Sequence, residues 1–206
     1  MSEELDPQLV RKSRQNLVIL WVIFLIPPVG AWLMYHFGGD LVPRATVNKG
    51  ELYQPARHLE LPPLLDENGK PVPADHFAHL WTLTYVGSSQ CDEACLAKLV
   101  TIRQVRTAQN QQMGRVGALY LAIDGEVPAD FDKWHQAFGA LQLGTTQQRQ
   151  VVLDQFRKQG EGDDVILGRI YVVDPLGNLM MRYRVDQDPS DIRKDIKKLL
   201  RVSAVR

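Results

Sequence analysis

The stretch Trp81–Val100 joins a strand pattern to a helix pattern and carries the only two cysteines of the 206-residue chain. Its first part, Trp81–Val86, is aromatic and β-branched, which is typical of a strand. A short polar break follows, and then a run of good helix formers. Cys91 and Cys95 therefore lie where a strand passes into a helix. Their spacing places both sulfurs on one side of the first helical turn, close enough to bridge or to share one soft metal ion.

The start of a helix is a place where a thiol becomes reactive. Unpaired backbone N–H groups and the positive end of the helix macrodipole favour a thiolate over a thiol there. We therefore expect the thiolate to be favoured at Cys91, which should be the better exposed sulfur. Three roles remain open for Cys91 and Cys95: a dithiol–disulfide pair that exchanges electrons with a partner, a transient Cu(I) site, or a static disulfide.

Charge and composition exclude several classes of protein. The chain has 24 Lys and Arg against 24 Asp and Glu, so its formal net charge is zero. A nucleic-acid partner would need a basic excess, and we expect none. Two cysteines are too few for a disulfide scaffold, and they are too few for a zinc site unless histidines join them.

An apolar run near the N-terminus predicts one membrane-spanning helix. Leu17–Phe37 contains no Asp, Glu, Lys or Arg and is long enough to cross a bilayer core of about 30 Å. Basic residues precede the run, so we expect residues 1–16 to form a cytoplasmic tail and the remainder to lie across the membrane. Pro27 and Pro28 should kink or split the span. A cleaved signal peptide and a buried core helix remain open as alternatives.

The rest of the chain divides into a linker and one folded domain. Residues 38–73 are rich in glycine and proline, and we expect a linker with a short edge hairpin whose turn signal is Asp66–Gly69. Residues 74–206 should form the folded domain, which is large enough to bury a core.

Beyond the cysteine-bearing helix, the pattern predicts a second strand, two helices, a hairpin and a closing helix. Val116–Asp124 is a continuous apolar run, typical of a buried parallel strand. We expect helices at Asp130–Leu143 and Thr146–Lys158, a hairpin turn at Asp174–Asn178 and a last helix capped by Asp188. With a right-handed crossover, this order predicts an α/β fold of the thioredoxin type, a three-layer α/β/α sandwich that follows the transmembrane helix.

The chain resembles the Sco/SenC branch of thioredoxin-like proteins over residues 48–201. The resemblance rests on the N-terminal apolar run, the Cys-x-x-x-Cys pair, the segment Tyr171–Asn178 with its Asp-Pro-x-Gly turn, and the closing helix. It implies a factor that is anchored in the inner membrane, faces the periplasm and helps to assemble the copper sites of cytochrome c oxidase. It also implies copper as a cofactor, and oxidase subunits or other assembly factors as partners.

One departure from the family pattern bears directly on function. Copper-binding members carry a histidine in the loop before the hairpin, but Val165–Arg169 contains none. Gly168–Ile170 also lacks the proline that flanks the active disulfide of ordinary thioredoxins. Cys91 and Cys95 thus stand as candidate catalytic residues and as candidate Cu(I) ligands. We expect thiol–disulfide exchange or Cu(I) delivery, and a non-catalytic membrane-tethered scaffold is the alternative. Whether the protein is an enzyme, a thiol–disulfide oxidoreductase, stays open.

Other polar residues are weaker candidates for a role in the site. His76 and His79 have a spacing that could present two imidazoles, but no sulfur or carboxylate lies at a matching position. His135 lies in an amphipathic pattern, where packing is the simpler role. Asp124, at the end of a buried strand, could tune the thiols or cap the following loop.

Overall fold

The computed structural model describes residues 7–37, 48–73 and 79–203 of the chain. The chain divides into two compact units, Met1–Thr46 and Val47–Arg206. The described part of the first unit is one helix, α1 (Pro7–Phe37), which continues through Pro27 and Pro28, so the two prolines do not split it.

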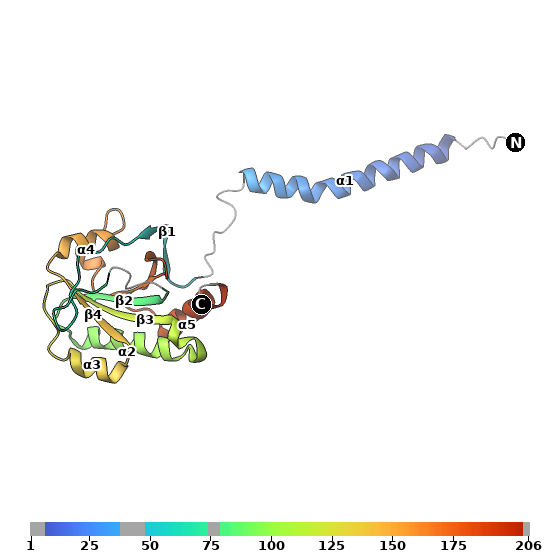
Figure 1. Ribbon diagram of the computed structural model, residues 1–206. Coiled ribbons are helices and arrows are strands. Elements are labelled where there is room, and N and C mark those ends of the chain that lie inside the picture. Colours follow the sequence, from blue (N-terminus) through green and yellow to red (C-terminus); the bar gives the residue numbers. More distant parts are fainter. Residues whose placement is uncertain (1–6, 38–47, 74–78, 204–206) are drawn as a thin grey trace. The chain divides into compact units, whose positions relative to one another are not determined.

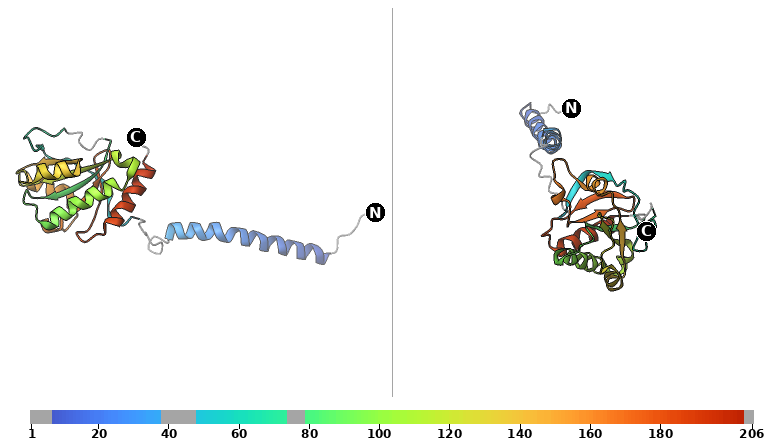
Figure 2. Two further views of the ribbon diagram at one scale, coloured as in Figure 1. Left: turned by 90° about the horizontal axis from the view of Figure 1, so that it is seen from below. Right: turned by 90° about the vertical axis from the view of Figure 1, so that its left-hand side faces the viewer.

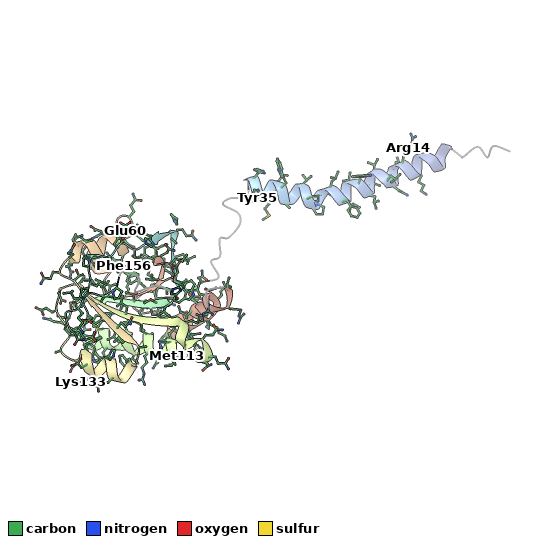
Figure 3. The ribbon with its side chains drawn as sticks, viewed as in Figure 1. Arg14, Tyr35, Glu60, Met113, Lys133 and Phe156 are labelled. Atoms are coloured by element: carbon green, nitrogen blue, oxygen red, sulfur yellow. A yellow bond between two sulfur atoms is a disulfide. The ribbon has the colours of Figure 1, made fainter. Side chains whose placement is uncertain are left out.

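The helix α1 is the one described helix that could span a membrane. Its portion Arg14–His36 is long and apolar enough to do so, and none of these side chains is buried. Figure 3 shows Arg14 and Tyr35 projecting away from the helix near its two ends. Apolar side chains exposed all around a helix are what a lipid-facing segment requires.

The second unit is built on one mixed sheet of six strands in the order β1-β6-β5-β2-β3-β4. The strands β2, β3 and β4 run parallel, whereas β5 is antiparallel to β2, β6 to β5, and β1 to β6. The strand bounds are β1 (Glu51–His58), β2 (Trp81–Gly87), β3 (Val116–Ala122), β4 (Leu141–Thr145), β5 (Ile170–Val173) and β6 (Asn178–Arg182).

Helices cover both faces of this sheet, so the unit has three layers (Figure 1). The helices α2, α3 and α5 pack on one face and α4 on the other. Figure 2 shows α2 and α5 side by side, in agreement with their direct contact. The predicted α/β/α sandwich of the thioredoxin type is therefore confirmed. The helix bounds are α2 (Glu93–Thr107), α3 (Phe131–Phe138), α4 (Arg149–Phe156) and α5 (Pro189–Val202), with short 3-10 helices η1 (Asn110–Arg115) and η2 (Asp163–Val165).

The two central strands explain why the core forms around the cysteine-bearing junction. β2 and β3 are buried along their whole length, as their continuous apolar composition requires. Because successive side chains point to opposite faces, Tyr85 and Tyr120 face the side of α2, while Val86 and Leu121 face the side of α4. Phe156, the last residue of α4, is buried inside the domain (Figure 3).

The predicted helix Asp130–Leu143 is wrong in its second half. The helix α3 ends at Phe138, because Gly139 adopts a left-handed conformation with φ 66° and donates its N–H to the His135 carbonyl. The chain then enters β4, which pairs in parallel with β3. The buried–exposed alternation of Leu141, Gln142 and Leu143 is the strand signal that the helix prediction overlooked.

The strand β1 lies in the segment that was expected to be a linker. Its pairing with β6 shifts register between Leu52 and Arg57, on either side of Pro55. A proline is tolerated there because β1 is the edge of the sheet. The expected edge hairpin is reduced to single bridges, in which Leu65 pairs with Pro71 and with Thr145.

A buried carboxylate fixes the place where the chain enters this unit. Asp195, on α5, is buried and accepts hydrogen bonds from the backbone N–H groups of Lys49 and Gly50, each at 2.8 Å. The Tyr183 hydroxyl donates a third bond at 3.3 Å. The closing helix therefore binds the segment just before β1. The expected start of that helix is confirmed, since Asp188 caps it and Pro189 opens it.

Candidate functional site

The two cysteines form a disulfide at the junction between β2 and α2. Cys91 and Cys95 are bonded through their sulfurs, with their Cα atoms 5.2 Å apart. Asp92 is the N-cap of α2, and its carboxylate accepts the Cys95 backbone N–H at 2.8 Å. A cap of this kind satisfies an otherwise unpaired donor and fixes the first helical turn. The structure thus brings together the two sulfurs that the spacing had placed on one side of that turn.

The two sulfurs differ in their access to solvent. Cys95 is 4% exposed and belongs to the core beneath α2. Cys91 is half-buried and packs against the margin of the same core. An attacking partner can therefore reach Cys91, whereas Cys95 is reached only through it.

One tyrosine lies against the disulfide, and a second packs against the ring of the first. The Tyr120 side chain is fully buried, and its hydroxyl oxygen lies 3.7 Å from Cys95 Sγ. The same hydroxyl donates its hydrogen to the Ser88 carbonyl. Tyr85, the direct neighbour of Tyr120 across the parallel pair, packs edge-on against the Tyr120 ring at 5.2 Å between centroids. Gly87 makes room for this arrangement, since a Cβ there would lie 2.6 Å from the Tyr85 ring.

Burial keeps both phenols in their neutral form. Desolvation, followed by the negative charge of Asp92, raises the pKa of Tyr85 to about 12. Desolvation also raises the pKa of Tyr120 far above its usual range, and the neighbouring Tyr85, Asp124 and Asp92 add to the effect. Each phenol therefore retains its hydrogen at neutral pH.

The loop before Cys91 is held by a carboxylate from the end of β3. Asp124 accepts the Ser89 backbone N–H at 2.7 Å and the Ser89 hydroxyl at 2.8 Å. Glu126 accepts the same hydroxyl at 3.4 Å. The sequence offered tuning of the thiols or capping of the following loop as roles for Asp124, and the structure shows Asp124 holding a different loop, the one before Cys91. A direct effect on the thiols stays a prediction.

The surroundings of the disulfide carry negative charge. Asp92 and Glu93 are exposed on the first turn of α2, and Asp124 and Glu126 are exposed beside Ser89. Negative charge of this kind opposes a thiolate, while the start of α2 favours one. The two effects act in opposite directions on the same sulfur, so we expect reactivity to depend on ionic strength.

The loop before β5 contributes no metal ligand near the sulfurs. Ile166 is fully buried in the core beneath α4, and the Gly168 N–H donates to the Val86 carbonyl at 3.0 Å. A Cβ on Gly168 would meet no heavy atom within 4 Å, so open space lies beside this glycine. Within the described residues, no group of three or more His, Cys, Asp or Glu side chains could hold a metal ion.

The described histidines among those named from the sequence, His79 and His135, have other partners. His76 lies outside the described residues. The backbone N–H of His79 donates to the Pro175 carbonyl at 3.3 Å, at the turn between β5 and β6. The Nδ1 atom of His135 lies 2.8 Å from the Leu141 carbonyl oxygen, so this side chain connects α3 to β4.

A second cluster of charges, built around a buried arginine, lies at the pairing of β1 with β6. Arg182 is 3% exposed and donates to Glu51 at 2.7 Å and to Glu161 at 2.6 Å. The hydrogen bond from Arg182 lowers the pKa of Glu51 to about 2. The bond to Glu161, followed by that to Glu51, raises the pKa of Arg182. Because all three groups are paired, this cluster joins the two strands and offers no free group for chemistry.

Sequence inspection missed Tyr120 as a part of the site and Tyr85 as the ring that packs against it. Each lies in a strand that was predicted, at a position of the strand that faces α2. The alternation of side chains in β2 and β3, combined with their parallel register, was the signal that could have paired them. The hydroxyl contact to Cys95 depends on how α2 sits over the sheet, and no local pattern contains that information.

Comparison with known proteins supports the fold of this unit. The protein-family model described as "Transmembrane-like, thioredoxin-like, C-terminal domain" matches residues 81–203. No curated protein sequence matches the chain.

Solved structures with this fold include several Sco proteins. ScoI of Bradyrhizobium japonicum with copper bound is 21% identical, with a TM-score of 0.50 over 72% of this chain and 98% of that one. Yeast Sco1 with copper bound is 16% identical, with a TM-score of 0.55 over 72% and 92% of the two chains. BsSco, a Sco-family cytochrome c oxidase assembly protein with a disulfide switch, is 18% identical, with a TM-score of 0.54 over 72% and 96%. Identity at this level shows a shared fold.

Proposed function

Because the chain belongs to the family of transmembrane-like, thioredoxin-like proteins, we propose that it is a membrane-anchored thiol–disulfide exchange factor that assists the assembly of cytochrome c oxidase. The observation that carries the proposal is the disulfide between half-buried Cys91 and buried Cys95 at the start of α2. One accessible and one inaccessible sulfur is the arrangement that a two-step exchange requires.

The exchange follows from the positions of the two sulfurs. In the reduced protein, the Cys91 thiolate attacks one sulfur of a partner disulfide, and the first partner sulfur leaves as a thiolate that takes up a proton. The Cys95 thiolate then attacks Cys91, forms the internal disulfide and releases the second partner sulfur. Two electrons pass from this protein to the partner. A dithiol protein returns them by the reverse steps.

The kind of partner comes from the Sco structures that share this fold. BsSco belongs to a family of cytochrome c oxidase assembly proteins, and its disulfide is described as a switch. In the proposed role, the exchange keeps cysteines of an oxidase subunit or of another assembly factor reduced until copper is inserted.

Transfer of Cu(I) is a second candidate, favoured by the convergence of two soft sulfurs at one helical turn. Two thiolates suffice to hold Cu(I) as a cargo of low coordination number. The loop Val165–Arg169 offers no imidazole, so we expect any Cu(II) state to be weak. Competition for Cu(I) with a chelator tests this candidate. Binding that survives replacement of both cysteines by serine would rule the sulfurs out as ligands.

The helix α1 is the proposed anchor in the inner membrane. Basic residues before the apolar run predict a cytoplasmic N-terminus and a periplasmic second unit. Protease added to intact spheroplasts should then digest the second unit while residues 1–16 stay protected. Digestion of the opposite end would reverse the orientation, and an N-terminus that begins after the apolar run would indicate a cleaved signal peptide.

The main test is the redox potential of the full-length protein in detergent, measured against glutathione buffers. An exchanging pair should titrate well above the range of stable structural disulfides, and a potential below roughly −300 mV would contradict exchange. In cells, the double variant Cys91→Ser with Cys95→Ser should lose support of oxidase activity. Full support by this variant would instead favour the scaffold without chemistry.

A further inference from the structure

A fully buried phenol lies directly against the inner sulfur of the disulfide. Tyr120 comes from the middle of the sheet, on β3, and its hydroxyl oxygen is 3.7 Å from Cys95 Sγ. In the disulfide the sulfur carries no hydrogen, and the hydroxyl donates to the Ser88 carbonyl instead. The phenol therefore already has one partner and touches a second atom that gains charge when the disulfide opens.

Reduction changes what the buried sulfur demands of its surroundings. Opening the disulfide leaves Cys95 as a thiol or thiolate in a position that is 4% exposed, where water cannot solvate the charge. A buried charge without a hydrogen-bond donor is costly. The Cys95 backbone N–H already donates to the Asp92 carboxylate, so it does not donate to the sulfur. The Tyr120 hydroxyl is the donor that the structure puts within reach.

We propose that the Tyr120 hydroxyl is the positioning group of the inner thiol: on reduction it donates its hydrogen to Cys95 Sγ and holds that sulfur as the attacking thiolate. This inference rests on the proposed exchange function and names a residue that acts in it. The hydroxyl gives up or shares its bond to Ser88, a carbonyl at the half-exposed margin of the site. Ser88 belongs to the loop that precedes Cys91, so the state of the disulfide is coupled to that loop.

The electrostatic surroundings favour a neutral donor in this place. Asp92 at the N-cap of α2 and Asp124 at the end of β3 both act on Tyr120 and raise its pKa, in addition to burial. With Tyr85 on β2, these are the titratable groups that face it. A cationic donor would be neutralised by the carboxylates, whereas a phenol that keeps its hydrogen can donate without adding charge.

The step affected is the second half of the exchange. With Cys91 bonded to a partner sulfur, the Cys95 thiolate attacks Cys91 Sγ, the bond between Cys91 and the partner breaks, and the partner sulfur leaves as a thiolate. A hydrogen bond to a charged group changes an equilibrium by roughly ten- to a hundredfold. We expect Tyr120→Phe to lower the thiolate population of Cys95 at least tenfold.

Tyr85→Phe is a matched control, since it removes a hydroxyl from the neighbouring ring on the same face. Tyr85 packs edge-on against Tyr120 but makes no hydrogen bond to either sulfur among the described residues. Both variants keep the aromatic ring and so preserve most of the packing. A general disturbance of the core should therefore affect them equally.

The experiment uses the full-length protein in detergent, reduced and then bonded at Cys91 to thionitrobenzoate. Release of thionitrobenzoate by Cys95 reports the internal attack as a first-order rate. We expect this rate to fall about three- to fourfold in Tyr120→Phe, because the more basic thiolate that remains is also more nucleophilic, and to stay near wild type in Tyr85→Phe. In the same variant, the equilibrium with glutathione should shift tenfold toward the disulfide, or about 30 mV.

A second measurement isolates the ionisation of the inner thiol. In the Cys91→Ser background, the ultraviolet absorbance of the Cys95 thiolate is followed against pH, and Tyr120→Phe should move its midpoint upward by about one pH unit. A fluorinated tyrosine at position 120, which has a more acidic hydroxyl, should move the midpoint downward, and it keeps the test open if Tyr120→Phe folds poorly.

The outcomes separate this inference from the proposed function. Unchanged release and an unchanged midpoint in Tyr120→Phe overturn the role of Tyr120 while leaving exchange intact. Equal effects of Tyr120→Phe and Tyr85→Phe also overturn it. A wild-type protein that fails to release thionitrobenzoate contradicts exchange itself, whatever Tyr120 does.

Discussion

Two polar corners of one sheet differ in how completely their groups are paired. At the pairing of β1 with β6, buried Arg182 is bonded to Glu51 and Glu161, and every charge has a partner. At the junction of β2 with α2, the inner sulfur touches a neutral phenol, and the outer sulfur is open to solvent. The first corner has its charges paired, and the second holds the sulfurs on which the proposed exchange depends.

The comparison teaches that a strongly shifted ionisation is not by itself a sign of function. The pKa of Glu51 falls to about 2 because its hydrogen bond to Arg182 is good, which is a structural cause. A reactive site needs a group that is not fully paired, such as an accessible sulfur, or a hydrogen-bond donor that can change its partner. The four predictions below test this division between a structural corner and a reactive corner.

The largest expected effect comes from Cys91→Ser. Exchange with a small disulfide should disappear, because the accessible attacking sulfur is gone. Arg182→Met should retain exchange at close to the wild-type rate, measured at a temperature where the variant is folded. Loss of exchange in the folded Arg182→Met protein would mean that the two corners are not independent.

Next in size is the effect of Arg182→Met on stability. Removal of the guanidinium leaves Glu51 and Glu161 without their shared partner, and we expect a loss of about 2–3 kcal/mol in the free energy of unfolding. This figure is below that of a fully buried pair because the Glu51 side chain is 49% exposed. Denaturant unfolding measures it.

The control for that measurement is Lys194→Met, which removes one partner of the exposed pair Lys194–Asp191. Exposed pairs of this kind contribute about 0–1 kcal/mol, so the control should change little. Equal losses in the two variants would show that burial does not distinguish the Arg182 cluster.

A smaller effect should appear in the acid range. The folded pKa of Glu51 is about 2 against an ordinary value of 4.5, so its contribution is complete above pH 4.5 and is lost as pH falls toward 2. After allowance for solvent screening, we expect about 1–2 kcal/mol from Glu51 over that window. Unfolding free energies of wild type and Glu51→Gln should converge as pH falls, and a constant difference between them would contradict this assignment.

The smallest expected effect concerns the loop that carries Ser89. Asp124→Asn weakens the bonds to Ser89 and removes one negative charge near Cys91, at a cost of about 1 kcal/mol or less. The reduced variant should react a few-fold faster with an anionic aromatic disulfide at low salt, and the difference should shrink as salt is added. A rate difference that does not depend on salt would assign the effect to loop geometry.

The sequence was most informative where one local pattern determines one element. The apolar run before Asp124 predicted β3, and the Asp188–Pro189 start predicted α5, because burial on both faces and helix capping are local requirements. The prediction failed at β4, where a short alternation follows a helix, and at β1, where Pro55 interrupts an edge strand. These strands depend on partners far away in the chain.

The candidate site shows the same difference between features set by a local pattern and features that depend on distant parts of the chain. The sequence identified the two sulfurs because their spacing places them on the first turn of one helix. The cap at Asp92 was found only in the structure. The sequence also did not identify Tyr120, whose contact with Cys95 joins a strand to a helix 25 residues earlier in the chain. The distance between the Tyr120 hydroxyl oxygen and Cys95 Sγ is set by the packing of α2 on the sheet.

The clamp at Asp195 has a mechanical consequence. A tether that pulls on the folded domain does so through Lys49 and Gly50, and both backbone N–H groups there are bound to a carboxylate inside α5. Tension along the chain is therefore borne first by the closing helix rather than by the edge strand β1. A force applied to the N-terminal end of the domain therefore does not first break the pairing of β1 with β6.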